Sequence, residues 1–189
     1  MNRIKAFLLI LIPSLILIII ITFGFLKDDK KNFGVNNNYA IGEIPKYFDG
    51  DLILKTTLGD EVNLQNLSGE IILIDFWSSW CAPCIAEAET LVSTYNRWKD
   101  YDVQFIGVAI WDTEEDVNKF IKKYNVNYPI VIDDNGQIAV DFGVAAIPEK
   151  ILIDKNGKIV KKLLGPSSSK DLNNIISEIS EDSLNLYEY

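Results

Sequence analysis

The chain has 189 residues and a net charge of −9, and this length fits one folded domain with additional segments. The charge is uneven, because residues 1–31 carry five basic and two acidic side chains, whereas the remainder carries 13 basic and 25 acidic ones. An acidic body argues against nucleic-acid binding, which needs a basic patch, and its simplest explanation is solubility. We therefore expect no nucleic-acid partner.

The first 26 residues are predicted to form an uncleaved signal anchor. Residues 6–26 hold no charged side chain, and in a helix these 21 residues rise about 31 Å, enough to cross the hydrocarbon core of a bilayer. A cleaved signal peptide is the alternative, but the apolar run is longer than a usual signal-peptide core and no Ala-x-Ala-like site follows it. We expect one transmembrane helix, with the lipid bilayer as its partner.

The charges that flank the apolar run bear on its orientation. Arg3 and Lys5 precede it and favour a cytoplasmic amino terminus, whereas the lysines at positions 27, 30 and 31 favour the reverse. Because the amino-terminal tail is short, we expect a single-pass protein of the inner membrane with its catalytic domain on the periplasmic side.

Three segments are predicted after the anchor. Residues 27–42 are rich in Lys, Asp and Asn and are expected to form a flexible tether. Residues 43–182 are expected to form one folded domain, and residues 183–189 a frayed tail.

Apolar runs and helical spacings alternate within that domain. Strands are predicted over 52–54, 62–64, 71–77, 103–110, 150–154 and 158–163, and helices near 84–95, 113–124, 137–142 and 168–179. Asn156-Gly157 lies between two apolar runs and predicts a hairpin turn. The pattern predicts an α/β architecture with a mixed sheet flanked by helices.

The domain is organised around residues 71–84, which read IILIDFWSSWCAPC. The initial apolar run fits a strand buried on both faces. Cys81 and Cys84 are the only cysteines, and they can close a disulfide if Cys84 lies in the first turn of the next helix, a place that suits Pro83. A helix N-terminus stabilises a thiolate, so we expect an exposed, nucleophilic Cys81 and a more buried, resolving Cys84.

Three other interpretations of the cysteine pair are weaker. Half of a zinc site would need further ligands, but the chain has no other cysteine and no histidine, so we expect no metal and no cofactor. A purely structural disulfide across so small a loop would stabilise the fold little. Inert buried thiols are disfavoured by the flanking Trp80 and Pro83. Redox chemistry is the favoured interpretation.

The segment from Ile74 to Cys84 closely resembles the active-site segment of thioredoxins. From about Ile44 to Ile179, the chain resembles the membrane-anchored TlpA-like branch, which includes the ResA-type and CcmG-type reductases of cytochrome c maturation. The resemblance implies a thioredoxin-like fold, with the N-terminal β-hairpin and the central insertion of that branch preceded by the transmembrane helix. The helix near 113–124 and residues 128–132 resemble that insertion.

The resemblance also implies a second functional segment. Pro148 stands where thioredoxin-like proteins carry a cis-proline that faces the two cysteines. The backbone of Ile147 would then be exposed to pair with an incoming client chain. The alternative is an ordinary trans-proline at the start of a strand.

Carboxylates are the candidate proton carriers, because the chain has no histidine. Asp75 stands where thioredoxins hold a buried aspartate, and Glu87 where ResA-type and CcmG-type proteins have a glutamate. Glu149, in a Pro-Glu pair that resembles the CcmG type, is the third candidate. For Glu87 the alternative is a solvated helix face. Trp80 is expected to shield the disulfide and to offer a contact surface.

These residues predict an extracytoplasmic thiol–disulfide oxidoreductase that reduces client disulfides. By resemblance, the clients are apocytochrome c or its maturation machinery, and a membrane thiol electron donor re-reduces the pair. A peroxiredoxin-type thiol peroxidase is an alternative, but the Pro-x-x-x-Thr-x-x-Cys arrangement it needs is missing before Cys81. A copper-binding Sco-like protein is another, but it needs Cys-x-x-x-Cys and a distant histidine.

Overall fold

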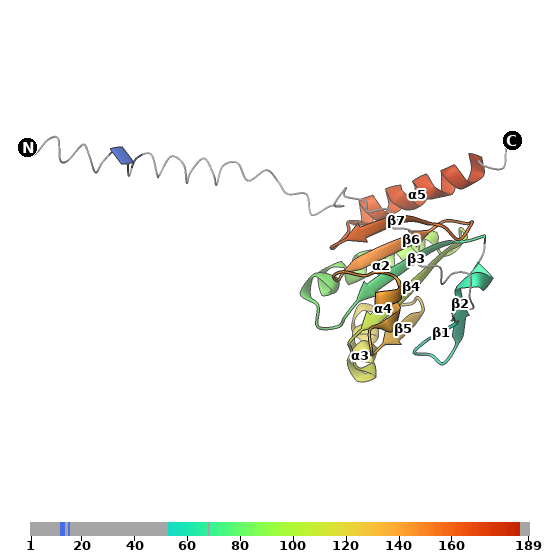
Figure 1. Ribbon diagram of the computed structural model, residues 1–189, viewed down its shortest axis with the longest axis horizontal. Helices are drawn as coiled ribbons and strands as arrows, with labels where there is room; N and C mark the ends of the chain where they lie inside the picture. The colour runs from blue at the N-terminus through green and yellow to red at the C-terminus, as the bar shows by residue number, and fades with distance from the viewer. Residues whose placement is uncertain (1–11, 14, 16–52, 68, 186–189) are drawn as a thin grey trace, which may run out of the picture. The chain divides into compact units, whose positions relative to one another are not determined.

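The computed structural model describes residues 12–13, 15, 53–67 and 69–185 (Figure 1). The chain divides into two units, residues 1–32 and 33–189. In the first unit, residues 12, 13 and 15 are helical. No helix within the described ranges is both long and apolar enough to cross a bilayer. The rest of the predicted anchor and the whole predicted tether lie outside the described residues.

A five-stranded sheet forms the centre of the second unit, in the order β5-β4-β3-β6-β7 (Figure 1). β3 pairs in parallel with β4 and antiparallel with β6, so the sheet is mixed, as predicted. Its central strand is buried along its whole length, which explains its nearly continuous apolar run. The strands are β3 (Ile71–Trp77), β4 (Val103–Ile110), β5 (Ile130–Asp133), β6 (Glu149–Ile153) and β7 (Ile159–Leu164).

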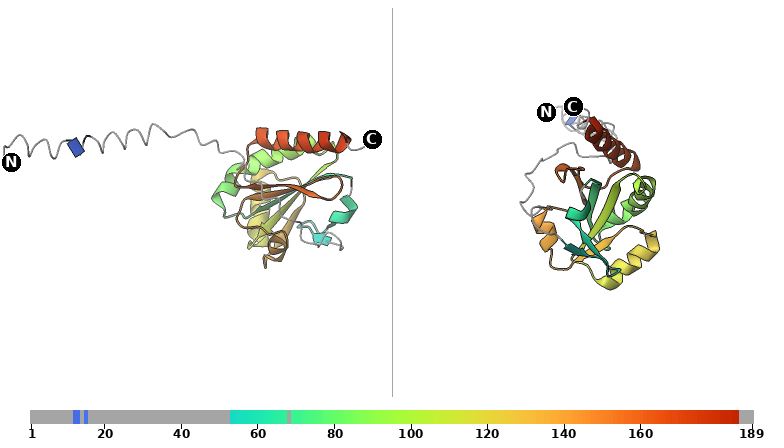
Figure 2. Two further views of the ribbon diagram at one scale, coloured as in Figure 1. Left: turned by 45° about the horizontal axis from the view of Figure 1, so that its top comes forward. Right: turned by 90° about the vertical axis from the view of Figure 1, so that its right-hand side faces the viewer.

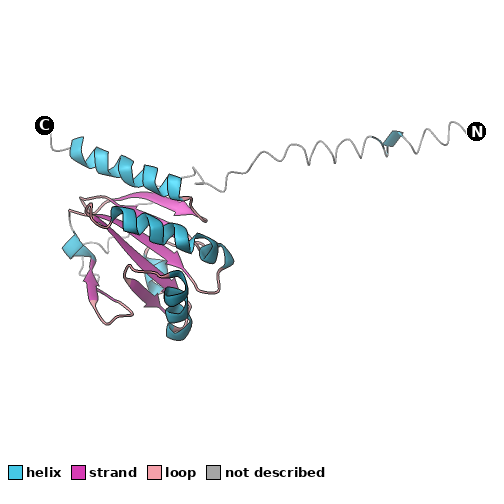
Figure 3. Ribbon diagram, turned by 180° about the vertical axis from the view of Figure 1, so that it is seen from behind, coloured by secondary structure: helices cyan, strands magenta, loops and turns pink. Residues whose placement is uncertain are grey.

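Alternation along β3 sends side chains into two separate cores. Leu73 and Trp77 join the core on the face covered by α2 (Ala82–Trp98), α3 (Glu114–Tyr124) and α5 (Ser169–Asn185). Ile74 and Phe76 join the other core, beneath α4 (Gln137–Asp141) and the N-terminal hairpin. Figure 2 shows the two layers on either side of the sheet, and Figure 3 shows α2 and α5 in front of it. The face that a strand residue occupies therefore decides whether it can reach α2.

The N-terminal hairpin is present as predicted. It pairs β1 (Ile53–Lys55) with β2 (Glu61–Asn63) and continues into a short 3₁₀ helix, η2 (Leu64–Leu67). A single bridge from Thr56 to Val131 connects it to β5 at the edge of the main sheet.

Local signals explain where the other elements begin and end. The Thr113 hydroxyl accepts a hydrogen bond from the Asp116 amide at the start of α3, and the Ser168 hydroxyl accepts one from the Asp171 amide at the start of α5. Gly157 has a φ of 78° in the turn between β6 and β7, so the predicted Asn-Gly hairpin is confirmed. α5 ends at Asn185, three residues beyond the predicted domain boundary.

Candidate active site

The two cysteines lie at the start of α2 and form a disulfide. Cys81 is the N-cap residue and Cys84 lies in the first turn, and their sulfurs are 2.11 Å apart. The Cys84 amide points back to the Cys81 sulfur at 3.4 Å, and Pro83 occupies the first turn without losing a helical hydrogen bond. The predicted position of the pair at a helix N-terminus is confirmed.

The predicted difference in exposure within the pair is not found. Cys81 is 6% exposed and Cys84 is 3% exposed, so in the disulfide form both are buried. The expectation of an exposed Cys81 is wrong for this form, because both cysteines pack into the core on the α2 face. Trp80, predicted to shield the disulfide, is itself 60% exposed, and its indole N–H donates to the Trp111 carbonyl at 3.3 Å.

The loop that leads into the cysteines is fastened to the end of β4. The Ser78 hydroxyl donates to the Ile110 carbonyl at 2.7 Å. Both the amide and the hydroxyl of Ser79 donate to the Asp112 carboxylate, at 2.5 and 3.0 Å. These bonds hold the loop between β3 and Cys81 against the end of β4, so the disulfide lies where these two neighbouring strands end.

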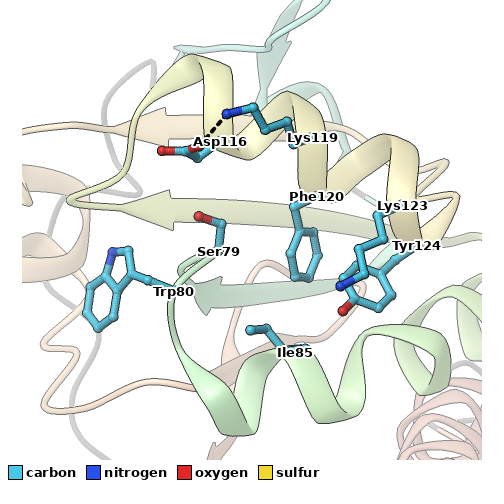
Figure 4. Close-up of a pocket in the computed structure, with 8 residues that line it drawn as sticks. All are labelled: Ser79, Trp80, Ile85, Asp116, Lys119, Phe120, Lys123 and Tyr124. Atoms are coloured by element: carbon cyan, nitrogen blue, oxygen red, sulfur yellow. Dashed lines mark hydrogen bonds and ion pairs between the residues drawn. The ribbon is translucent and has the colours of Figure 1, made fainter.

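A hollow of about 320 Å³ lies beside this loop, between the start of α2 and α3. Figure 4 shows the Phe120 ring and Ile85 at its centre and the Trp80 ring at one side. Its charged groups are on α3, where Lys119 pairs with Asp116 at 3.0 Å. The hollow is lined by Ser79, Trp80, Ile85, Asp116, Lys119, Phe120, Lys123 and Tyr124.

The segment that contains Pro148 lies at the same end of the sheet as the disulfide. Pro148 immediately precedes Glu149, whose register partner is Phe76 near the end of β3. The peptide bond between Ile147 and Pro148 is cis, as predicted, and the Pro148 carbonyl accepts a hydrogen bond from the Gly165 amide at 2.8 Å. That Ile147 pairs with a client backbone stays a prediction.

Two of the three candidate acids come together on the α2 face. Asp75 in β3 is 3% exposed, and Glu87 in α2, one turn after Cys84, is also 3% exposed. The alternative of a solvated position for Glu87 is therefore wrong. The Lys150 ammonium, from β6, donates to Glu87, and Lys150 is the register partner of Asp75. One buried lysine thus bonds to one of the two buried acids, Glu87, and is the strand neighbour of the other, Asp75.

Burial raises the pKa values of both acids. Desolvation raises the pKa of Asp75 from 3.8 to about 7, opposed by the charge of Lys150 and aided by that of Glu87. Desolvation also raises the pKa of Glu87, opposed by the charge and hydrogen bond of Lys150 and by the Ser167 amide. An acid that titrates near neutral pH can accept a proton from a thiol and release it again.

Glu149, the third candidate, is placed apart from the other two. It points to the opposite face of the sheet, since it is adjacent to Lys150 in β6 and strand side chains alternate. There its carboxylate is fully buried and pairs with the Lys162 ammonium at 2.7 Å. The structure therefore does not bring Glu149 together with Asp75 and Glu87.

Lys150 is the residue that sequence reasoning missed. The sequence pattern predicts it only as the first residue of a strand over 150–154. A lysine directly before the apolar run Ile151-Leu152-Ile153 is the available signal, because a charge in a buried strand needs a partner. The sequence could not identify that partner, since Glu87 is 63 residues away.

Comparison with known proteins agrees with this geometry. Residues 50–162 match the AhpC/TSA family. The chain belongs to this family. It is 31% identical over 158 residues to the thiol-disulfide oxidoreductase ResA of a strain of Bacillus cereus, covering 83% of this chain and 84% of that protein. The predicted relation to ResA-type proteins is confirmed.

Solved structures share the fold. The crystal structure of StoA from Bacillus subtilis superposes with a TM-score of 0.60 at 26% identity, covering 70% of this chain and 98% of that one. The thioredoxin domain of a thiol-disulfide oxidoreductase from Bacteroides vulgatus gives a TM-score of 0.61 at 28% identity, covering 73% and 95%. The thioredoxin-like fold predicted from residues 74–84 is confirmed.

Proposed function

We propose that this protein is a membrane-anchored thiol–disulfide oxidoreductase that reduces disulfide bonds of client proteins outside the cytoplasm. The observation that carries the proposal is the Cys81–Cys84 disulfide at the N-terminus of α2, on the same face of the sheet as two buried acids. Relatives of similar length that are named thiol-disulfide oxidoreductase ResA support the same chemistry.

The reaction begins from the dithiol form. The Cys81 thiolate, stabilised by the N-terminus of α2, attacks one sulfur of a client disulfide, and the other client sulfur leaves as a thiolate. Cys84 then loses its proton and attacks the Cys81 sulfur. This step re-forms the Cys81–Cys84 disulfide and releases the second client thiol. Two electrons pass to the client, and a thiol electron donor in the membrane restores the dithiol.

The proton on Cys84 must leave before the second attack. Asp75 and Glu87 are the buried bases on that face, and the pKa of Asp75, about 7, lets its carboxylate accept a proton near neutral pH. Ile147 and Pro148 border the same end of the sheet and are proposed to hold the client strand. Trp80, exposed beside the hollow, is proposed as part of the client contact.

Variants of the two cysteines test this order of events. With an oxidised protein client, Cys84→Ser is expected to accumulate a mixed disulfide through Cys81, visible as a combined mass under non-reducing conditions. Cys81→Ser is expected to accumulate none. Trapping through Cys84 alone, or full activity of both variants, would overturn the assignment of the attacking and resolving thiols.

We propose apocytochrome c as the client class, which rests on the resemblance to the reductases of cytochrome c maturation. The test compares oxidised apocytochrome c with oxidised insulin at equal concentrations of the reduced protein. Faster reduction of apocytochrome c supports the proposal. Equal rates on both substrates would remove the client assignment and leave the thiol chemistry in place.

We also propose that residues 6–26 anchor the protein in the inner membrane, with the domain on the periplasmic side. The uncharged run and the two basic residues before it support this topology. Protease added to intact spheroplasts is expected to digest the domain. Protection until the membrane is lysed would contradict the orientation, and recovery in the soluble fraction would contradict the anchor.

A further inference from the structure

The fully buried Lys150 is bonded to Glu87 and is the register partner of Asp75, and it belongs to β6 rather than to α2, at whose start both cysteines lie. We propose that Lys150 is a positioning residue, which holds Glu87 as a carboxylate and leaves Asp75 as the one proton acceptor for Cys84. This inference rests on the proposed thiol–disulfide exchange and extends it to a residue of β6.

The hydrogen bonds distinguish the two acids. One oxygen of Glu87 accepts from the Lys150 ammonium, and the other accepts from the Ser167 amide at 2.8 Å. Lys150 also donates to the Gly165 carbonyl at 3.0 Å, so its ammonium is held at Glu87. Both oxygens of Glu87 therefore act as acceptors, which is the role of an ionised carboxylate. Protonating Glu87 would sacrifice one of these bonds.

Asp75 has the opposite character. Within the described part of the chain, its Oδ1 atom is buried without a hydrogen-bond partner. Its register partner on one side is Lys150, and on the other side it is Gly107, which offers no side chain. Asp75 thus has an oxygen free to take a proton, and only a lysine that is already bonded to Glu87 lies opposite to it.

The charge balance on this face allows one proton to be exchanged. Among the described residues, the buried charged and titratable groups here are Asp75 from β3, Glu87 and the cysteines from α2, Lys150 from β6, and Tyr128, which precedes β5. Two further tyrosines, Tyr95 and Tyr124, are partly buried against the same core. α5 contributes apolar residues such as Leu172 and Ile176 to this core. One ammonium neutralises one carboxylate, so the second carboxyl is most stable when it carries a proton.

This arrangement gives each group one part in the second step. The Cys84 thiol gives its proton to the Asp75 carboxylate, and the resulting thiolate attacks the Cys81 sulfur of the mixed disulfide. The client thiolate leaves, and Asp75 then releases the proton to solvent. Glu87 stays ionised throughout because Lys150 and Ser167 hold it, and Lys150 itself touches no reacting atom.

Two variants with opposite expected effects test the proposal. Carboxyl resonances of ¹³C-labelled, oxidised full-length protein are followed against pH by NMR. In Lys150→Met the Asp75 midpoint is expected to rise by at least about one pH unit, because two carboxyls then lack a cation. In Glu87→Gln the Asp75 midpoint is expected to fall by a similar amount, since Asp75 is then the one carboxylate that the Lys150 charge can stabilise.

A matched control separates this effect from the loss of a lysine as such. Lys161 on the neighbouring strand β7 also pairs with a helical glutamate, Glu178, at 2.5 Å, but that glutamate is largely exposed. Lys161→Met is expected to leave the Asp75 midpoint in place. In the reduced protein, the pH profile for resolution of the mixed disulfide is expected to move with the Asp75 midpoint in Lys150→Met and Glu87→Gln.

Equal midpoints in all variants, or shifts of the same sign in Lys150→Met and Glu87→Gln, would overturn the proposal. A pH profile for resolution of the mixed disulfide that does not shift with the Asp75 midpoint would also overturn it. If Lys150→Met does not fold, Glu87→Gln alone decides, and an unchanged or higher midpoint contradicts the proposal. The titration uses no client, so its failure is distinguishable from failure of the proposed reductase activity.

Discussion

Asp75 and Lys150 are direct register partners across the antiparallel pair β3–β6, and both side chains enter the core beneath α2. Facing residues in such a pair are close enough to interact directly. The ammonium of Lys150, however, is bonded to Glu87. The consequence is a buried aspartic acid whose pKa, about 7, lies where the chemistry of a thiol at neutral pH needs it.

The first prediction concerns stability against pH in the oxidised protein. Because burial raises the pKa of Asp75 from 3.8 to about 7, the folded state keeps a proton that the unfolded chain releases. The stability due to this proton is complete below pH 4 and is lost as pH rises to about 7, by about 4 kcal/mol in total. Asp75→Asn removes this loss, so the free energy of unfolding of the variant, relative to that of the wild type, is expected to increase as pH rises over that range. Chemical denaturation at a series of pH values measures it, and parallel curves would contradict the buried titration.

The second prediction concerns the other neighbour of Asp75. A Cβ atom at Gly107 would lie 2.5 Å from Cδ1 of Ile130 and 2.9 Å from Nε1 of Trp77, which is too close in both cases. Gly107→Ala is therefore expected to reduce the free energy of unfolding by about 1–3 kcal/mol. Adding Ile130→Val removes the Cδ1 atom and is expected to recover part of the loss. Urea denaturation tests both variants, and a neutral Gly107→Ala would contradict the close packing.

The third prediction tests the separation of Glu149 from the redox site. Lys162→Met leaves the fully buried Glu149 carboxylate without its ion pair. We expect a loss of about 2 kcal/mol in the free energy of unfolding, because an unpaired buried charge is costly and Lys162 itself is partly exposed. The pH midpoint of mixed-disulfide resolution is expected to stay where it is, since Glu149 lies on the other face of the sheet. A shifted midpoint would show that Glu149 influences the proton transfer after all.

The fourth prediction concerns the exposed Trp80. Its ring is 60% exposed and its indole N–H makes one hydrogen bond, to the Trp111 carbonyl. Trp80→Ala is therefore expected to change the free energy of unfolding by no more than about 0.5 kcal/mol. The KM for a protein client is expected to rise, because aromatic contact area is lost beside the hollow. A large loss of stability with an unchanged KM would show that Trp80 packs rather than binds.

Much of the fold could be predicted from local sequence patterns. The run of residues 71–74, the Asn156-Gly157 turn and the Thr113 and Ser168 caps each depend on near neighbours, and the structure contains each of these features. The placement of the disulfide at the start of α2 could be predicted in the same way, because the spacing of Cys81 and Cys84 and Pro83 between them are local signals.

The environment of the site could not be predicted to the same extent. β6 begins at Glu149, one residue before the predicted start of the strand. Only the pairing of β6 with β3 shows which face of the sheet Glu149 points to and which face Lys150 points to. The pairing of Lys150 with Glu87 joins residues 63 positions apart, which no local pattern reports. The burial of Cys81 depends likewise on core residues from distant segments.

The reduction potential of the Cys81–Cys84 pair tests the central claim most directly. It is measured in the protein by equilibration with glutathione or dithiothreitol buffers of known potential. A reductase is expected to have a value near or below that of thioredoxin, about −270 mV. A value near that of the oxidant DsbA, about −120 mV, would contradict the reducing role and would favour disulfide formation on the same fold.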